Sequence, residues 1–298
     1  MRRAAGLVLL LAGLAPGASG QDLKSLLPNP PYFIPNESVA RIREKLGLST
    51  DQLLGALVPI AQGLARPPIS NYHAGAAALG ASGAIYLGVN LEFPGSQLSQ
   101  TVHCEHFAVV NALAHGERAL KKMALSAPSC GHCRQFLYEL NAIPEILIPG
   151  RPAVPLTHYL PEPFGPRELG KEKLLLDPVD HGLVLAAAPK ALAAAALAAA
   201  NAAYAPYSGD PSGVALRTKD GKIYAGSAVE SVAFNPSLPP LQAAFVVLLS
   251  AGRSYADIAD AALVQKRGAK ADHAEVTRAV LKSVAPDAGL VELAAEAP

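Results

Sequence analysis

Four residues between positions 103 and 133 have the types and the spacing of a metal site. His103 and Glu105 stand two positions apart at the start of an apolar run, and Cys130 and Cys133 stand one helical turn apart further along the chain. A catalytic zinc ion needs three protein ligands and one open position for water, which one imidazole and two thiolates can supply. The spacing therefore predicts one Zn²⁺ per chain on His103, Cys130 and Cys133. Glu105 then remains free for acid/base chemistry.

Two other interpretations of these residues stay open. The sequence C-G-H-C is also typical of disulfide oxidoreductases, because a C-x-x-C pair lowers the pKa of a thiol. Thiol–disulfide exchange through Cys130 and Cys133 would leave His103 and Glu105 without a role, and the chain lacks the Trp that precedes the first Cys in those proteins. Alternatively, a zinc-stabilised domain could serve only as a binding module, which would leave Glu105 idle.

The order H-x-E followed by P-x-C-x-x-C resembles the signature of the zinc-dependent nucleoside and nucleobase deaminases. The resemblance implies that water activated by zinc attacks the ring carbon bearing the amino group, while Glu105 transfers protons. Zinc lowers the pKa of bound water from about 15.7 to about 7, so the attacking species exists at neutral pH.

Composition limits the class of substrate. The chain has 298 residues, 51% of them hydrophobic and 16% charged, which predicts a compact protein large enough for two domains. A formal net charge of +1 gives no basic surface for a nucleic acid. A polynucleotide cytidine deaminase, which shares the zinc motif, is therefore the weaker alternative, and a small free nucleoside is the expected substrate.

The N-terminus has the layout of a secretory signal peptide. Two arginines precede an apolar run at positions 4–15, and small residues follow at Ala18 and Gly20. Cleavage is expected before Gln21, which predicts an exported protein, periplasmic or secreted; without cleavage the protein would be cytoplasmic. No other segment predicts a membrane span, because Pro189 and Lys190 interrupt the alanine-rich run.

The catalytic residues need elements to position them. Two helices are predicted at 38–46 and 51–64, the second capped by Ser49 or Thr50. Residues 74–90 predict a hairpin with its turn around Ser82 and Gly83.

The metal motif itself predicts further elements. Helices are expected at 107–120, with His103 and Glu105 at the N-terminal end, and at 130–141, and a strand is expected at 145–148. Alternating helices and strands predict an α/β fold, a three-layer α/β/α sandwich.

The second half of the chain repeats the first without its chemistry. DGKIYAGSAVES aligns with SGAIYLGVNLEF at a constant offset of 138 residues, which pairs Ile223 with Ile85 and Glu230 with Glu92. LPPLQAAFVV replaces TVHCEHFAVV, and no Cys follows it. The predicted division of the chain is a signal peptide (1–20), an N-terminal helical segment (21–49), a catalytic zinc deaminase domain (50–150), a proline-rich linker (151–187) and a non-catalytic deaminase-like repeat (188–298).

From about Pro35 onward the chain resembles the larger, homodimeric, two-domain form of cytidine deaminase. The segments that carry the resemblance are NLEF, TVHCEHFA, CGHCRQF, PEPFGP and AFNPSLPPLQ. The resemblance implies hydrolytic deamination of cytidine and 2′-deoxycytidine in pyrimidine salvage by a homodimer.

The resemblance also implies roles for six further residues. Asn90 and Glu92 would hydrogen-bond the ribose, and the ring of Tyr72 would lie beside the pyrimidine. Residues of the partner chain would cover the base, namely Phe164, Ala233 and Phe234.

Three residues depart from the family pattern. The family usually has Phe at Tyr72, Ala at Cys104, and Pro rather than Ser129 before the first zinc Cys. None of these changes removes a ligand, and Cys104 is expected to be a buried, unpaired thiol. His106 and His132 lie near the ligands in sequence and are expected to be structural.

Overall fold

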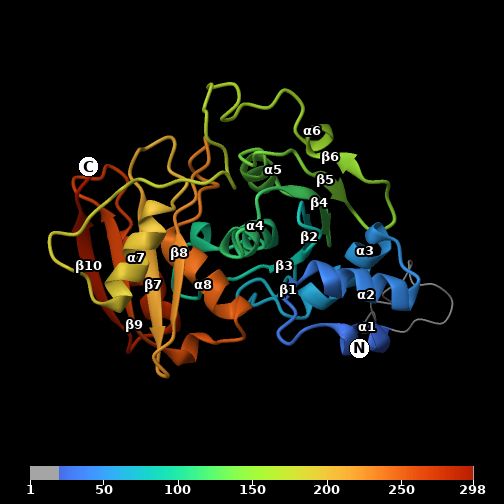
Figure 1. Cartoon of the computed structure of the whole chain (residues 1–298), viewed down its shortest axis with the longest axis horizontal. Helices are drawn as coiled ribbons and strands as arrows, with labels where there is room; N and C mark the ends of the chain where they lie inside the picture. The colour runs from blue at the N-terminus through green and yellow to red at the C-terminus, as the bar shows by residue number, and fades with distance from the viewer. Residues whose placement is uncertain (1–19, 298) are drawn as a thin grey trace, which may run out of the picture.

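The computed structural model describes residues 20–297. This part of the chain folds into two α/β halves that lie side by side, each with one sheet and covering helices (Figure 1). The duplicated α/β fold predicted from the sequence is confirmed. The predicted signal peptide lies, except for Gly20, outside the described residues. Within residues 20–297, none of the helices is both long and apolar enough to cross a bilayer.

The first half is built on a six-stranded sheet. Strand β2 pairs antiparallel with β3 and β4. Strands β4 and β5 are parallel, so the chain has to cross over between them, and helix α5 lies in this crossover. The strands lie in the order β1-β3-β2-β4-β5-β6 and comprise β1 (Phe33–Ile34), β2 (Gly75–Gly80), β3 (Ile85–Val89), β4 (Leu120–Leu125), β5 (Glu145–Leu147) and β6 (Val154–Pro155).

Helices cover both faces of this sheet. Helix α3 packs on one face and α4 on the other, and small residues in the strands allow both helices to approach closely. A Cβ atom on Gly75 would lie 2.7 Å from the carbonyl oxygen of Val58 in α3. The helical segments are α1 (Gly20–Leu26), α2 (Asn36–Leu46), α3 (Thr50–Gln62), η1 (Leu98–Gln100), α4 (Cys104–Ala114), α5 (Gly131–Leu137) and α6 (Leu156–Tyr159).

Two predicted helices were too long. The helix expected at 107–120 ends at Ala114, because Gly116 takes a left-handed φ of 73° after the cap, and the missed strand β4 begins at Leu120. The helix expected at 130–141 ends at Leu137. The hairpin, the strand beginning at Glu145 and the cap at Ser49 are confirmed; Ser49 forms a capping box with Gln52.

The second half has a smaller sheet with the strand order β10-β9-β7-β8. Helix α7 packs against β7 and β9, and α8 packs against β8. Its elements are α7 (Ala191–Asn201), β7 (Ser212–Thr218), β8 (Ile223–Ser227), α8 (Pro240–Ser250), η2 (Tyr255–Asp257), β9 (Ile258–Lys266), α9 (Ala274–Val284) and β10 (Gly289–Ala295).

The internal repeat is visible in the details of both hairpins. Gly83 and its counterpart Gly221 hold the turns at φ values of 88° and 85°. The ladder from β2 to β4 is irregular between Leu79 and Gly80, and the ladder from β7 to β9 is irregular at the corresponding positions of the second half. The same backbone irregularity in both copies indicates one scaffold used twice.

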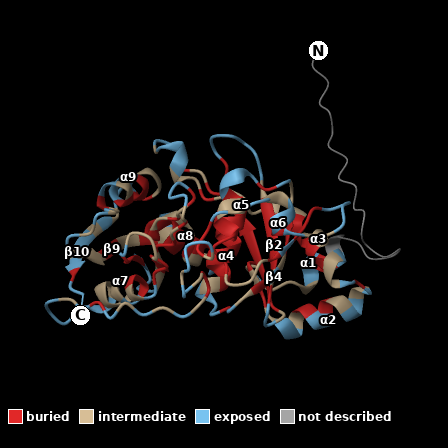
Figure 2. Cartoon of the chain, turned by 90° about the horizontal axis from the view of Figure 1, so that it is seen from above, coloured by how far each residue is buried: buried red, intermediate tan, exposed pale blue. Residues whose placement is uncertain are grey.

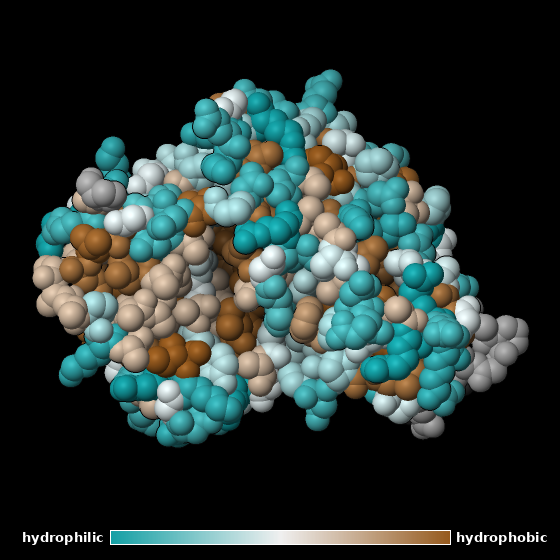
Figure 3. Space-filling view, viewed as in Figure 1, coloured by the Kyte–Doolittle hydropathy of each residue, from teal (hydrophilic) through white to brown (hydrophobic). Residues whose placement is uncertain are grey.

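The two halves share one interior. Helices α4 and α8 lie against each other, and a continuous cluster of buried apolar side chains extends from the first sheet across this contact. Buried residues concentrate along α4, β2 and β4 in the middle of the molecule, whereas α2 is exposed on its outer side (Figure 2). The visible face is mostly hydrophilic over the first half and more hydrophobic over the second half, with a hollow between the halves that has apolar walls (Figure 3).

Candidate metal centre and active site

Helix α4 brings two of the predicted residues to one end of the sheet. His103 is its N-cap, and Glu105 lies in its first turn, where the helix dipole favours a negative charge. The helix sits close to β3 at Gly88, because a Cβ atom there would lie 2.0 Å from the carbonyl oxygen of Cys104. Gly88 is thus what allows the start of α4 to reach its position.

Helix α5 supplies the two thiols. Cys130 is its N-cap, and the Cys130 Sγ accepts a hydrogen bond from the backbone N–H of Cys133 at 3.5 Å. A helix N-terminus stabilises a thiolate through its free N–H groups. A hydrogen bond from the Cys133 thiol, with a further contribution from His103, lowers the pKa of Cys130 to about 3.

His103, Cys130 and Cys133 form a compact donor cluster. The two Sγ atoms are 3.4 Å apart, and His103 Nδ1 lies 3.6 Å from Cys130 Sγ and 3.2 Å from Cys133 Sγ. Ligand atoms around tetrahedral zinc are about 3.5–3.8 Å apart for the usual bond lengths. The three residues therefore fit a zinc ion, and among the described residues no other such cluster of three or more His, Cys, Asp or Glu occurs.

Glu105 is buried and doubly hydrogen-bonded. Ser129 Oγ donates to Glu105 Oε1 at 2.7 Å, and Cys104 Sγ donates to Oε2 at 3.2 Å. The carboxyl group is 5% exposed and lines the same cavity as His103 and Cys130. A carboxyl group that lies beside the donor cluster and faces a cavity is placed for proton transfer to a bound molecule.

The cavity collects six of the ten predicted site residues. It has a volume of about 250 Å³, and its walls also include Thr101, Ser126 and Pro128. The predicted residues that line it are Tyr72, Asn90, Glu92, His103, Glu105 and Cys130. Cys133 lies behind the cavity as the buried third member of the donor cluster.

Asn90 and Glu92 lie just beyond the end of β3 and hold the wall of the cavity. Asn90 Nδ2 donates to the backbone oxygen of Tyr72 at 2.8 Å, which fixes the segment bearing the exposed tyrosine ring. Glu92 accepts hydrogen bonds from Ser70 Oγ and from the backbone N–H groups of Ile69 and Ser70. Burial acts to raise the pKa of Glu92, but these hydrogen bonds outweigh it, and the pKa lies below its usual value.

Three predicted residues lie away from this cavity. Phe164 and Phe234 are 57% and 67% exposed, and Ala233 is exposed beside Phe234. None of the three is among the residues that line the cavity of its own chain. Phe234 has a left-handed φ of 58°, which is unusual for a bulky side chain.

Sequence analysis gave no supporting role to three residues that hold this site together. Ser70 bonds Glu92, Ser129 bonds Glu105, and Arg134 Nε donates to the backbone oxygen of Ser129 at 2.8 Å. Only proximity to the motif could have indicated Ser129 and Arg134, because both lie within one helical turn of a predicted ligand. Ser70 carries no sequence signal of its own.

The two histidines expected to be structural differ in environment. His106 is buried against the ring of Phe136, with ring centroids 4.0 Å apart, and its Nε2 contacts the backbone oxygen of Pro236 in the second half at 2.9 Å. Burial, reinforced by His103, lowers the pKa of His106 to about 4, so the ring is neutral and Nε2 is the donor. His132 is exposed.

Both halves of the chain match a model of a known protein family. Residues 49–148 and residues 156–278 each match a family model described as the cytidine and deoxycytidylate deaminase zinc-binding region. The chain is similar to the solved cytidine deaminase of Mycobacterium tuberculosis, with 28% identity over 39% of this chain and 98% of that chain and a TM-score of 0.37. It is also similar to the cytidine deaminase of Burkholderia pseudomallei, with 26% identity over 39% of this chain and 100% of that chain and a TM-score of 0.36.

Proposed function

Because the chain belongs to the cytidine and deoxycytidylate deaminase family, we propose that it hydrolyses cytidine and 2′-deoxycytidine to uridine and 2′-deoxyuridine, with release of ammonia. It is an enzyme of the cytidine deaminase class with a zinc cofactor. The observation that carries the choice of reaction is Glu105, a buried carboxyl group that shares a cavity with the donor cluster. Pyrimidine salvage is the pathway that such a reaction would serve.

The residues of the chain divide the chemistry between them. His103, Cys130 and Cys133 hold the zinc ion, which when bound lowers the pKa of a coordinated water molecule. Glu105 takes a proton from the attacking water and delivers it to the ring nitrogen next to the reacting carbon. It then takes the second proton of the same water, from the hydroxyl group now bonded to the reacting carbon, and passes it to the amino group, which leaves as ammonia while the carbonyl group forms. Because one carboxyl group serves as base and then as acid, its position has to stay fixed between the two steps.

The sugar lies against the end of β3 in this proposal. Glu92 keeps acceptor capacity for a ribose hydroxyl, since an ionised carboxylate has about four lone-pair positions. Asn90 acts on the same wall by holding the backbone of Tyr72 at 2.8 Å. The ring of Tyr72, 58% exposed at the mouth of the cavity, lies beside the base.

We further propose a homodimer in which each chain covers the other chain's base with Phe164, Ala233 and Phe234. What supports this is that both phenylalanine rings are exposed and line no part of their own cavity. The test is a mixed dimer of one Glu105→Ala chain and one Phe234→Ala chain. The Phe234→Ala chain keeps its own Glu105 and receives Phe234 from its partner, so one good site should remain. The absence of any good site would show that each chain covers its own base and would contradict the proposal. A monomeric fragment of residues 1–180 with full activity would contradict the proposal.

The two alternative functions make different demands on the same residues. Thiol–disulfide exchange needs Cys130 and Cys133 but has no use for His103, which lies within 3.6 Å of both thiols. A polynucleotide deaminase needs a basic surface, and the net charge of +1 offers none. Deamination of a free nucleoside uses all four motif residues.

One sample decides between these functions. Protein purified without chelators is assayed for loss of cytidine absorbance and analysed for metal. The expected result is one zinc per chain and cytidine turnover. Protein without zinc, with a disulfide between Cys130 and Cys133, would favour thiol exchange instead.

We also propose that the mature protein is exported after cleavage before Gln21. The arginine pair, the apolar run and the small residues before position 21 support this. N-terminal sequencing of protein from its native host should give Gln21 or a close neighbour. A first residue of Met1 or Arg2 would contradict export.

A further inference from the structure

Glu105 is held by two donors that come from different elements. Ser129 precedes the N-cap of α5, and Cys104 is the first residue of α4. Each bonds a different carboxylate oxygen, at 2.7 Å for Ser129 Oγ and 3.2 Å for Cys104 Sγ. Both side chains and Glu105 are at least nine-tenths buried, so these hydrogen bonds are largely shielded from bulk water.

Ser129 is itself held by Arg134 of α5, which also contacts α6. Arg134 Nε donates to the backbone oxygen of Ser129 at 2.8 Å, and Arg134 Nη1 donates to the backbone oxygen of Tyr159 at 3.0 Å. The Arg134 guanidinium also lies over the ring of Tyr159, 5.6 Å from its centroid. A chain of contacts therefore runs from the end of α6 to the carboxyl group of Glu105.

We propose that Ser129 and Cys104 are positioning residues that fix the plane of the Glu105 carboxylate. Two donors on two oxygens prevent rotation about the last side-chain bond, and each oxygen keeps a lone pair for the proton it must accept. The hydroxyl is the main donor, because a thiol is a weak one. This assignment rests on the proposed deamination and adds how its acid/base group is held in place.

Serine at 129 and cysteine at 104 are two of the three departures from the family pattern, and the proline usual before the first zinc Cys has no side-chain donor. The two departures meet on one carboxyl group.

The test is a double-mutant cycle in the zinc-loaded full chain with cytidine as substrate. Ser129→Ala should lower kcat roughly 10- to 100-fold, the usual effect of removing a hydrogen bond to a charged group, with KM within about twofold of wild type. Ser129→Thr should restore kcat to within about threefold. Cys104→Ala should lower kcat by about threefold, and Cys104→Ser should restore it. In a Glu105→Ala background, Ser129→Ala should change the residual rate by less than about twofold.

Two further measurements separate positioning from general damage. Zinc content should stay at one per chain in every variant, which excludes an effect through Cys130. Ser212→Ala is the matched control, since Ser212 is also fully buried but its Oγ contacts no hydrogen-bond partner in the described structure, and it should leave kcat unchanged.

Three outcomes would overturn the assignment. The first is a wild-type kcat in Ser129→Ala. The second is that Ser129→Ala lowers the rate by the same factor in the Glu105→Ala background as in the wild type. The third is that Ser129→Ala no longer binds zinc. Wild-type protein that does not deaminate cytidine would instead overturn the proposed function, and this assignment with it.

Discussion

The two halves of the chain share a carboxylate clamp but use it differently. In the first half Glu92 accepts from Ser70 Oγ and from two backbone N–H groups. In the second half Glu230 accepts from Ser208 Oγ and from the N–H groups of Tyr207 and Ser208, at positions 138 residues later. Only the first clamp faces the cavity beside the donor cluster. The clamp is therefore part of the scaffold, and substrate binding is a use that one copy makes of it.

The copies differ at the N-terminus of the helix that follows each hairpin, which is α4 in the first half and α8 in the second. Helix α4 starts with His103 and carries Glu105 in its first turn, whereas α8 starts at Pro239 and carries the buried Leu241 there. Proline at the first turn begins a helix well but supplies no ligand. The same backbone thus presents chemistry in one half and packing in the other.

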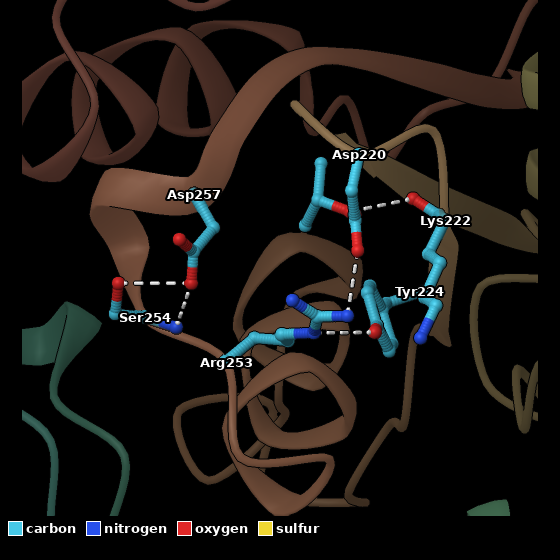
Figure 4. A network of polar contacts seen from close by, with 7 residues as sticks. Asp220, Lys222, Tyr224, Arg253, Ser254 and Asp257 are labelled. Atoms are coloured by element: carbon cyan, nitrogen blue, oxygen red, sulfur yellow. Dashed lines mark hydrogen bonds and ion pairs between the residues drawn. The ribbon is translucent and has the colours of Figure 1, made fainter.

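A polar network at the opposite end of the same helices shows an inversion of charge. After Gly116, Glu117 accepts hydrogen bonds from Tyr86 and Ser82. After Gly252, Arg253 occupies the matching place and donates to Tyr224 and Asp220 (Figure 4). In the first half a carboxylate accepts from neighbouring donors, and in the second half a guanidinium donates to neighbouring acceptors. The two copies therefore keep the same arrangement of side chains with opposite charge at the central residue.

The contact between the halves has an approximate two-fold pattern. His106 on α4 donates to the backbone oxygen of Pro236 at 2.9 Å, and Gln242, its counterpart on α8, donates to Gln100 Oε1 at 2.8 Å. Pro236 and Gln100 are themselves counterparts, because after the hairpins the offset between the copies falls from 138 to 136 residues. The paired bridges show this change: Leu91 and Val229 differ by 138 positions, and their partners Val102 and Leu238 differ by 136. Reciprocal contacts of this kind are typical of an isologous interface. The second half therefore packs on the first much as a second subunit would.

The largest expected effects come from alanine substitutions in the first turns of α4 and α8. Glu105→Ala should lower kcat by at least ~10²–10⁴-fold, because it removes the acid/base group, while leaving zinc bound. Leu241→Ala should instead lower the free energy of unfolding by about 2–5 kcal/mol, because it leaves a cavity in the core. Steady-state kinetics, metal analysis and denaturant unfolding measure the two effects. A Glu105→Ala enzyme within tenfold of wild-type kcat would contradict the division of roles.

Next in size is a matched pair of glycines. A Cβ atom on Gly88 would lie 2.0 Å from the Cys104 backbone oxygen in α4, and one on Gly226 would lie 2.1 Å from the Ala244 backbone nitrogen in α8. Gly88→Ala and Gly226→Ala should each cost about 1–3 kcal/mol of stability through overpacking. Only Gly88→Ala moves the helix that carries Glu105, so its kcat should fall roughly tenfold more than that of Gly226→Ala.

Thermal unfolding measures the loss of stability of the two variants, and steady-state kinetics measures their loss of kcat. Equal losses of activity at equal losses of stability would show that the position of α4 is not what limits the reaction.

The clamps give the third test. Glu92→Gln should raise KM for cytidine about tenfold, since it removes a charged acceptor from the cavity wall. Glu230→Gln removes the same clamp in the other half and should leave KM within about twofold. Both variants should lose similar stability, because the two carboxylates accept from the same kinds of donor. A KM effect of equal size in both would place the role of Glu92 in folding alone.

Sequence predicted the parts of this protein that local chemistry determines. The donor cluster followed from residue types and spacing, and the repeat followed from matching glycines such as Gly83 and Gly221. Strand β4 was missed because LKKMAL continues an apolar helix without a proline, and only the left-handed Gly116 marks the break. Contacts that cross between halves, such as His106 with Pro236, join residues 130 positions apart and leave no periodic signal.

The smallest expected effect lies where the two halves meet, at Glu139. This fully buried residue follows α5 in the first half and accepts from Tyr204, Tyr207 and the backbone N–H of Val232, all in the second half. Val232 directly precedes Ala233 and Phe234, so the carboxyl group also anchors the loop proposed to cover the partner's base. Burial raises the pKa of Glu139, despite the hydrogen bonds that favour its ionised form.

The pH dependence of stability tests this joint between the halves. Because the folded-state pKa of Glu139 lies above the unfolded value of about 4.5, the folded protein binds more protons there, and its stability falls as pH rises through that interval. Glu139→Gln cannot ionise and so lacks this fall. Relative to wild type, the variant should be similar below pH of about 4.5 and more stable near neutrality, by about the 1 kcal/mol typical of single substitutions. Denaturant unfolding at several pH values measures the difference. Glu168→Gln is the control, since a hydrogen bond from Tyr138 lowers the pKa of that exposed carboxyl group and its contribution has the opposite sign. If the difference in the free energy of unfolding between Glu139→Gln and wild type were the same at all pH values, burial would not raise the pKa of Glu139 in the folded protein.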